Sequence, residues 1–377
     1  MRILQTIDNL YVENGGLSTC LYNLVKGLNA TGCSADILSL SDDRHQLASN
    51  GEEWIKTLKD DHKTPFRISK NYKKFLLNDT DYDLYHTNGL WLYCNHITAR
   101  TALKKRKPYI FSPHGMMYPQ ALKYSTWKKK LILSLFFNKD INRATCLHAT
   151  CMQEAEYLRD LGYKQPVAVI PNGVIMENKI PGIKNQNISF RKIGFLGRLH
   201  PIKKIESLIE AFAKANSKNA ELLIIGNGEK DYGQSLRRET ERFQLKNVTF
   251  TGFLSGEEKQ KALSTLSALF VPSESENFGM IVPEALMAEI PVMANTGTPW
   301  EDLNHYKCGW WAKNEVDSIA TIMNEVFSMP EEELGTMGKN GRKLVEEKYA
   351  IDVVSLKMRQ LYEWILNGGE KPEFVYD

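Results

Sequence analysis

Residues 269–294, which read LFVPSESENFGMIVPEALMAEIPVMA, decide the fold. The stretch opens with an apolar run at 269–271 that is typical of a buried strand. After a polar loop, Pro283 and Glu284 suit the first turn of a helix, because proline needs no amide partner there and a carboxylate favours the positive end of the helix dipole. The apolar run 290–294 resumes the sheet. We therefore predict strand, loop, helix and strand, the repeating unit of a parallel α/β sheet.

Two glutamates, Glu276 and Glu284, lie on either side of Gly279 in this stretch. Free amides at a helix start attract anions, phosphates above all, and a glycine lets a ligand approach the backbone closely. The loop therefore suits a ligand with a sugar, a diphosphate and a ribose in a row. Taken alone, the pair fits equally a surface glutamate in a turn and a glutamate that stabilises a helix dipole.

The pair has seven residues between its members, with Phe278 and Gly279 inside and Pro283 before the second glutamate. This pattern resembles the paired-glutamate motif of retaining glycosyltransferases with the GT-B fold, in particular glycosyltransferase family 4 (group 1). The resemblance implies an α/β protein with two Rossmann-like parallel-sheet domains that face each other across a cleft. It also implies that a sugar moves from a nucleotide-sugar donor to a saccharide or lipid-linked glycan, as in bacterial-type surface polysaccharide synthesis.

Length and composition agree with such a protein. A chain of 377 residues, 42% of them hydrophobic, can fill two cores. The formal net charge of +3 gives no bias toward nucleic acid. Six cysteines without CxxC pairs argue against a zinc site or a disulfide framework and fit a reducing cytoplasm. We expect no signal peptide, and no membrane span because every apolar run is shorter than the roughly 20 residues required.

Alternating strand and helix patterns in both halves predict two parallel-sheet domains. We expect residues 1–174 to form the N-terminal, acceptor-side domain and residues 175–352 the C-terminal, donor-side domain, with a polar linker at 175–187. The resemblance implies that a C-terminal helix, from about 353 to 377, packs back on the first domain. Residues 41–78 are polar, and we expect them to be irregular.

Two places in the N-terminal half carry candidate ligand contacts. Gly15 and Gly16 follow the first strand, where they fit either a tight turn or a phosphate contact, and the resemblance places them near the donor diphosphate. The strand at 109–112 delivers His114 to the carboxyl edge of the sheet, where open α/β sheets bind ligands. The family has a matching His-Gly step that faces the transferred sugar, which implies that role for His114. His86 is a weaker candidate for an acceptor contact.

In the C-terminal half, Arg198 and Lys203 follow the strand at 192–196 and precede a helix. Cations at a helix start oppose the dipole unless an anionic ligand lies there, so a diphosphate leaving group would explain both. A solvated helix start is the alternative. Family 4 shows the same arginine and lysine, usually with glycine next, whereas this chain has Lys204 there.

The resemblance also implies the roles of the remaining residues. Arg198 and Lys203 would neutralise the leaving diphosphate, Glu276 would contact and place the sugar, and Glu284 would hold the ribose hydroxyls. The other residues expected to contact the donor are Gly226, Phe253, Leu254, Phe278, Gly279 and Met280. Many relatives have Gly-Gly-x-Pro-Glu where residues 297–300 read GTPW, which leaves the contacts of that segment open.

The sequence contains no DxD-type acidic pair near the donor loops and no His/Cys cluster, so we expect neither a metal nor a cofactor. The substrate would be a UDP- or GDP-sugar. Two other classes stay open. One is a different GT-B nucleotide-sugar enzyme, such as an epimerase or a hydrolase, and the other is a non-catalytic nucleotide-sugar-binding protein.

Residues 126–137 read TWKKKLILSLFF, a basic start followed by a strongly apolar helix. One interpretation is a peripheral contact at the inner face of the membrane, in which Lys128, Lys129 and Lys130 meet anionic lipid and aromatic side chains enter the interface. A core helix with a solvated charge cluster at its end fits at least as well. We therefore expect a cytoplasmic protein and leave the membrane contact open.

Overall fold

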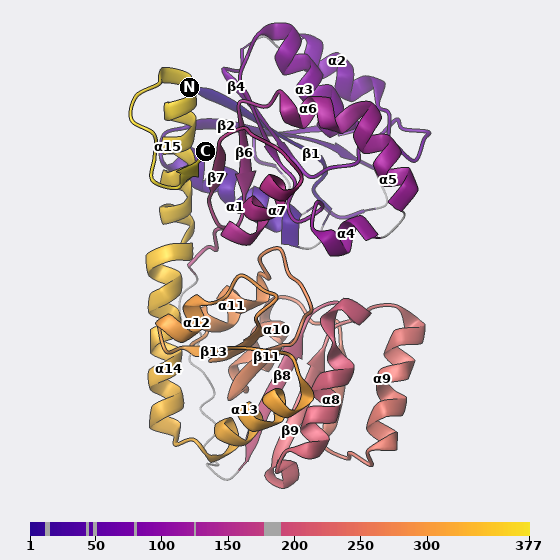
Figure 1. Cartoon of the computed structure of the whole chain (residues 1–377), viewed down its shortest axis with the longest axis vertical. Coiled ribbons are helices and arrows are strands. Elements are labelled where there is room, and N and C mark those ends of the chain that lie inside the picture. The colour runs from indigo at the N-terminus through magenta and orange to yellow at the C-terminus, as the bar shows by residue number, and fades with distance from the viewer. Residues whose placement is uncertain (12–15, 43–44, 48–50, 79–80, 124–125, 177–189) are drawn as a thin grey trace. The chain divides into compact units, whose positions relative to one another are not determined.

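The computed structural model describes residues 1–11, 16–42, 45–47, 51–78, 81–123, 126–176 and 190–377. The chain divides into two compact units, residues 1–175 with 350–377 and residues 176–349, coloured along the chain in Figure 1. Almost all of the linker expected at 175–187 lies outside the described residues.

The first unit is built on a sheet that is parallel except at one edge. Its described strands, in spatial order, are β14 (Val375–Tyr376), β7 (Val167–Val169), β6 (Cys146–Ala149), β5 (Tyr109–Ser112), β4 (Leu84–Asn88), β1 (Arg2–Asn9), β2 (Ser34–Ser41) and β3 (Ile55–Lys59). Only β14 pairs antiparallel among these described strands. The strand order changes direction between β4 and β1, so the loops after these strands lie at a switch point of the kind that binds ligands.

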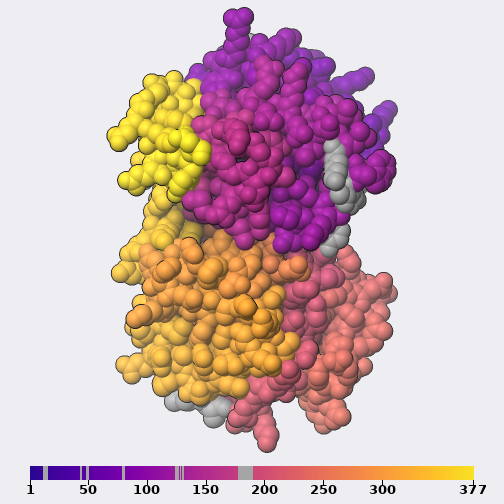
Figure 2. All heavy atoms as spheres, viewed as in Figure 1, coloured from indigo at the N-terminus to yellow at the C-terminus, as the bar shows by residue number. Residues whose placement is uncertain are grey.

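Helices cover both faces of the first sheet, because alternate residues of β1 belong to opposite cores. Ile3 and Ile7 pack with α1 (Gly16–Ala30) and α15 (Ile351–Asn367), whereas Leu4 belongs to the core that includes α3 (Tyr93–Lys105). Figure 2 shows the C-terminal residues in yellow against the indigo and magenta surface of this unit. The remaining helical elements are α2 (Lys70–Asn78), α4 (Pro119–Lys123), α5 (Thr126–Ile132), the π-helical turn η2 (Leu133–Phe137), α6 (Asn138–Asn142) and α7 (Met152–Asp160).

The second unit repeats this plan with a fully parallel sheet. Within the described residues the strand order is β10 (Val248–Gly252), β9 (Ala220–Ile225), β8 (Arg191–Leu196), β11 (Ala268–Val271), β12 (Val292–Asn295) and β13 (Gly309–Ala312). The order reverses between β8 and β11, which makes the loops after these two strands the switch point. The helical elements are η3 (Pro201–Lys203), α8 (Ile205–Lys214), η4 (Ser217–Asn219), α9 (Lys230–Arg242), α10 (Gly256–Ser264), α11 (Ile281–Met287), α12 (Asp302–His305), α13 (Val316–Ser328), α14 (Glu331–Leu344) and η5 (Val345–Tyr349).

The prediction that residues 41–78 are irregular is wrong, because β3 and α2 lie there. β3 is an edge strand without a fully buried residue, and α2 buries only Tyr72 and Leu76. Neither element therefore shows the apolar period that a sequence pattern detects. The helix predicted near Pro283 begins at Ile281, which keeps the proline in the first turn, where no amide is needed.

Candidate functional site

The switch point of the second unit brings Lys203 and Glu276 together. The two residues lie on the loops that leave the adjacent strands β8 and β11. The amide of Glu274 donates to the carbonyl oxygen of Ile202 at 2.8 Å and ties the loops to each other. Lys203 Nζ then donates to Glu276 Oε1, and the two side chains are only 19% and 12% exposed. A cation and a carboxylate are thus held in contact, mostly out of water, at the edge where a ligand is expected.

Arg198 lies exposed on the same loop, and no ion pair links it to any described residue. Its charge is therefore open to an anionic ligand. Lys204, at the position where the family usually has glycine, has φ 51° and ψ 40°. This left-handed conformation suits glycine best, so the loop keeps its shape and the lysine only adds a surface charge, 3.4 Å from Glu274.

Gly226 and Gly279 are required by the backbone for different reasons. A Cβ at Gly226 would lie 1.9 Å from the carbonyl oxygen of Gly197, so only glycine permits these two loops to pack. Gly226 therefore shapes the loop that carries Arg198. Gly279 has φ 78°, and a Cβ there would meet Glu276 no closer than 3.5 Å, so the turn itself calls for glycine. Within the described residues, the amides of Gly279 and Met280 donate no hydrogen bond.

The side chain of Phe278 belongs to the core rather than to the ligand surface. It is 4% exposed and packs on Trp300 and Tyr349, with ring centroids 5.1 and 5.5 Å away. Trp300 is fully buried, and its Nε1 donates to the carbonyl oxygen of Phe278 at 2.5 Å. The expected donor contact by the Phe278 side chain is therefore wrong, because this ring holds the loop in place. The departure from the family pattern at 297–300 supplies the tryptophan that supports the Glu276 loop.

We expect Trp300→Phe to lower the free energy of unfolding by about 1–3 kcal/mol, because the buried carbonyl of Phe278 would lose its donor. Urea unfolding measures this loss. Trp310→Phe is the matched control, since Trp310 Nε1 donates to Glu325 at 2.9 Å on the surface and its removal should cost less than about 1 kcal/mol. Equal losses in the two variants would contradict the supporting role of Trp300.

Glu284 lies in the first turn of α11, and Lys259 of α10 donates to its Oε2 at 3.0 Å. Both side chains are 29% exposed, so water and ligands can reach the pair. Lys259 could not be predicted from the sequence, where it is only a basic residue on the helix after β10. At the end of β10, Phe253 is 66% exposed and Leu254 is half-buried, so both can meet a ligand.

In the first unit, β5 delivers His114 to the carboxyl edge of the sheet. Its backbone has φ 52°, and its Nε2 lies 2.9 Å from Asn88 Oδ1 at the end of β4. Burial, together with the neighbouring His148, lowers the pKa of His114 to about 3. The imidazole is therefore neutral near pH 7 and can hydrogen-bond a sugar without adding charge.

Glu154, in the first turn of α7, holds the turn that follows His114. Its carboxylate accepts from the amide of Gly115 and from the amide of Thr150, the latter at 2.8 Å. Burial raises the pKa of Glu154, and these hydrogen bonds oppose that rise. No sequence pattern indicates this contact, because a glutamate in the first turn of a helix is ordinary.

His86 cannot meet an acceptor, and that expectation is wrong. The side chain is fully buried, with Nε2 2.5 Å from Ser112 Oγ and Nδ1 2.9 Å from Tyr362 Oη. A central strand covered on both faces buries even its polar residues. Gly16 is the exposed first residue of α1, and Gly15 lies outside the described residues.

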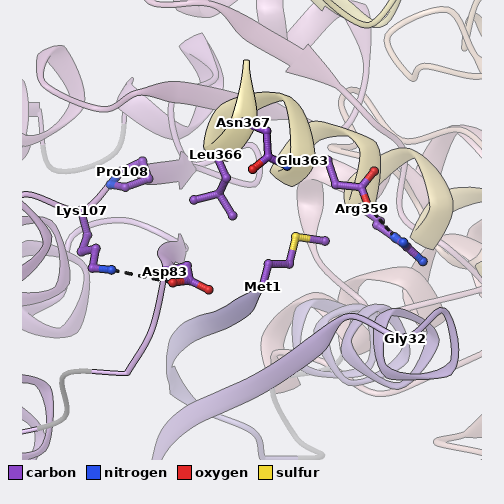
Figure 3. A pocket seen from close by; sticks show the side chains of 9 residues that line it. All are labelled: Met1, Gly32, Asp83, Lys107, Pro108, Arg359, Glu363, Leu366 and Asn367. Atoms are coloured by element: carbon purple, nitrogen blue, oxygen red, sulfur yellow. Dashed lines mark hydrogen bonds and ion pairs between the residues drawn. The ribbon is translucent and has the colours of Figure 1, made fainter. Parts of the chain in front are cut away.

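A pocket of about 550 Å³ lies at the opposite, amino edge of the first sheet, next to α15 (Figure 3). The charged side chains that line it are already paired. Lys107 lies 3.7 Å from Asp83, and Arg359 lies 2.8 Å from Glu363. Because open α/β sheets bind ligands at the carboxyl ends of their strands, and this pocket lies at the amino edge, the carboxyl edges remain the candidate site.

Comparisons with known proteins point to one family. A family model described as Glycosyl transferases group 1 matches residues 177–344, and one described as Glycosyltransferase Family 4 matches residues 14–178. The O-antigen chain mannosyltransferase C of Escherichia coli is 24% identical over 98% of this chain and 100% of its own. An uncharacterized glycosyltransferase of Methanocaldococcus jannaschii is 27% identical over 93% of this chain and 94% of its own.

Solved structures confirm the expected GT-B fold. Anabaena HepE, in complex with UDP and glucose, matches with a TM-score of 0.76 and 18% identity, over 96% of this chain and 99% of that one. Sucrose-phosphate synthase from Thermosynechococcus elongatus matches with a TM-score of 0.78 and 20% identity, over 98% of this chain and 100% of that one.

Proposed function

Because this chain belongs to the group 1 glycosyltransferases of family 4, we propose that it retains the anomeric configuration of the sugar it transfers, with the leaving diphosphate bound by the second unit. The observation that carries the proposal is the contact of Lys203 with Glu276 beside the exposed Arg198. Two cations and a carboxylate at one switch point match the leaving group and the sugar of a nucleotide-sugar donor.

The transfer step places charge where these cations lie. The bond between the anomeric carbon and the phosphate oxygen breaks, and negative charge grows on the diphosphate. Lys203, which is held in contact with Glu276, and the exposed Arg198 stabilise that charge. The acceptor oxygen bonds to the anomeric carbon on the same face and gives its proton to the leaving phosphate. Glu276 contacts and places the sugar without becoming a covalent nucleophile.

The diphosphate competes with Glu276 for Lys203. In this structure the Lys203 ammonium has the Glu276 carboxylate as its partner. A bound diphosphate offers the ammonium a more highly charged partner and frees Glu276 to accept hydrogen bonds from sugar hydroxyls. The ion pair therefore keeps both side chains in position until the donor arrives.

The other contacts follow from where each side chain lies. Glu284 holds the ribose hydroxyls, with Lys259 beside it, and the exposed ring of Phe253 meets the base. In the first unit, His114 contacts the transferred sugar through a neutral ring.

The relatives suggest the substrate classes. HepE was solved with UDP and glucose, and the Escherichia coli relative is an O-antigen chain mannosyltransferase. We therefore assign a UDP- or GDP-sugar as donor and a saccharide or lipid-linked glycan as acceptor, in surface polysaccharide synthesis, without a cofactor. The test is the anomeric configuration of the product, measured by NMR on material made from an α-linked donor. An α-linked product is expected. A β-linked product would exclude retention, and free sugar released equally with or without acceptor would indicate a hydrolase.

We expect transfer to survive an excess of EDTA. No group of His, Cys, Asp and Glu among the described residues is arranged to hold a metal ion, and Arg198 with Lys203 can supply the positive charge that a metal otherwise brings. Rates are compared with and without chelator. Activity that disappears in EDTA and returns with magnesium or manganese would contradict a cation-only leaving-group site.

An apolar patch on the first unit supports a peripheral contact at the inner face of the membrane. Trp127, Leu131 and Leu135, four residues apart on α5 and η2, are 68%, 50% and 62% exposed. Large apolar side chains grouped on one surface mark interaction sites. None of the helices in the described part of the chain has both the length and the apolar character needed to cross a bilayer.

The lysines at 128–130 do not all extend into solvent, as the run of three in the sequence suggested. Lys129 turns inward, where its Nζ donates to the carbonyl oxygen of Ala121 and lies 5.7 Å from the ring centroid of Trp91. Burial also lowers the pKa of Lys129. The expectation that Lys129 meets lipid is therefore wrong, and the side chains of Lys128 and Lys130 lie outside the described residues.

We expect the double variant Trp127→Ser/Leu135→Ser to bind vesicles containing anionic phosphatidylglycerol at least about tenfold more weakly, because two apolar side chains no longer enter the interface. Co-sedimentation measures the change, and high salt should weaken the wild type. Leu356→Ser is the matched control, since Leu356 is 50% exposed on α15. Equal sedimentation of all three proteins would count against the membrane contact.

A further inference from the structure

A chain of buried polar groups crosses the first sheet toward His114, and its first bond has a known direction. The carbonyl oxygen of Ile170 lies 2.8 Å from His148 Nε2. A carbonyl oxygen only accepts, so this ring nitrogen carries a proton. Burial lowers the pKa of His148 to about 4, which keeps the ring neutral. Its Nδ1 must therefore accept, and the donor is Ser112 Oγ at 2.8 Å.

The direction of each following bond is fixed in turn. Ser112 has given its one proton to His148, so it accepts from His86 Nε2 at 2.5 Å. Burial lowers the pKa of His86, so this ring is neutral as well. Its Nδ1 must then accept, and two donors face it, Tyr362 Oη at 2.9 Å and Gln5 Nε2 at 3.2 Å. The oxygen of Tyr362 in turn accepts from Gln5 Nε2 at 2.5 Å.

Asn88 transmits this order to His114. Asn88 Nδ2 donates to Gln5 Oε1 at 2.8 Å and lies 3.4 Å from the carbonyl oxygens of Thr6 and His86. Three acceptors around Nδ2 leave Asn88 Oδ1 facing His114 Nε2 at 2.9 Å. His114 Nε2 therefore donates. The second ring nitrogen of His114, Nδ1, is buried and has no hydrogen-bond partner among the described residues.

We propose that Asn88, with Gln5 and Tyr362 behind it, is a positioning residue that fixes the proton of His114 on Nε2 and reserves Nδ1 as an acceptor for a substrate hydroxyl. The tautomer of each histidine follows from the hydrogen bonds alone, whereas the assignment of the hydroxyl to a sugar rests on the proposed sugar transfer. A phosphate or carbonyl oxygen cannot serve at Nδ1, because it brings no proton. The network thus selects a hydroxyl at this point.

Other titratable groups near His114 leave this order in place. The ring of His148 lies 6.1 Å away and is neutral, and the carboxylate of Glu154 is occupied by backbone amides next to Gly115. Tyr362 lies on α15 and contacts His86. The C-terminal helix therefore takes part in the hydrogen-bond network that leads to His114. A cavity of about 10 Å³ that His114 helps to line has room for one water at most, so it admits a single hydroxyl group and not a whole sugar ring.

The first experiment determines the tautomer of His114 by ¹⁵N NMR on histidine-labelled protein, with His114→Asn used to assign its signals. Near pH 7 we expect a neutral ring with the proton on Nε2. In Asn88→Leu, a population with the proton on Nδ1 should appear, while the signals of His86 and His148 report that the fold is intact. Wild-type His114 protonated on Nδ1, or on both nitrogens, would overturn the proposal. This measurement needs no turnover, so it can fail or succeed independently of the proposed transfer.

The second experiment separates the acceptor role from a structural one. An asparagine at 114 can place its amide oxygen near the position of Nδ1, whereas a glutamine can place its amide nitrogen near the position of Nε2. With the better of UDP-glucose and GDP-mannose as donor, His114→Asn should keep a kcat/KM about tenfold higher than His114→Gln, the size of one hydrogen bond. If His114 only holds Asn88, His114→Gln should be the more active. Equal or reversed activities of folded variants would overturn the acceptor role.

Discussion

Lys203→Ala is expected to lower kcat by about 100- to 1000-fold at saturating donor, which corresponds to roughly 2.7–4 kcal/mol of lost transition-state stabilisation. The ammonium of Lys203 lies at the switch point, 19% exposed, where the proposed mechanism has charge grow as the glycosidic bond breaks. An interaction that strengthens only in the transition state appears in kcat, and KM changes less. Arg198→Ala should show the same pattern, with a smaller loss because Arg198 is exposed.

Lys204→Gly is the matched control for Lys203→Ala. Lys204 is the next residue, its ammonium lies 3.4 Å from Glu274, and its left-handed backbone accepts glycine without strain. Steady-state kinetics with a melting curve for each variant should show a near-normal kcat for Lys204→Gly. A near-normal kcat for folded Lys203→Ala would show that this lysine does not stabilise the leaving group.

Glu276→Gln and Glu284→Gln should affect different kinetic constants, although the two glutamates look alike in the sequence. Glu276 contacts Lys203 and, in the proposed transfer, the reacting sugar, so we expect kcat to fall by about 100-fold. In the proposed site Glu284 holds the ribose, which does not react, so its loss should raise the KM for the donor by about tenfold with a smaller effect on kcat.

Two further variants make this comparison specific. Glu274→Gln removes a 50% exposed carboxylate two residues before Glu276 and should leave both constants unchanged. Lys259→Met removes the partner of Glu284 and should alter KM rather than kcat. If Glu276→Gln raised only KM while Glu284→Gln lowered only kcat, the two assignments would have to be exchanged.

The parts of the site that the sequence predicts are those set by strand ends. His114, Arg198 and Lys203 each follow a strand closely, and in a parallel sheet the carboxyl ends of strands meet at one edge. The sequence singled out Gly279 for the close approach of a ligand, whereas the structure requires glycine there for its left-handed backbone, φ 78°. Residue type and spacing alone place such side chains at the edge where open α/β sheets bind ligands.

The rest depends on contacts between segments distant in the sequence. Lys259 contacts Glu284 from another helix. Trp300 supports the Glu276 loop by donating to the backbone carbonyl of Phe278, a contact that no pattern of side chains in the sequence indicates. Phe278 shows the limit most clearly, since an aromatic residue inside a motif fits a ligand contact and a core position equally well, and only packing decides. The hydrogen-bond network that sets the tautomer of His114 includes Tyr362, which lies 276 positions after its partner His86 in the chain.

The most direct test of the central claim is the release of nucleoside diphosphate from a panel of UDP- and GDP-sugars, with and without glycan acceptors. We predict that one donor is hydrolysed slowly by the wild-type protein, that an acceptor accelerates the release, and that Lys203→Ala abolishes most of it. If no donor released its nucleoside diphosphate faster with wild-type protein than with Lys203→Ala, the assignment of this switch point as a glycosyl-transfer site would be contradicted.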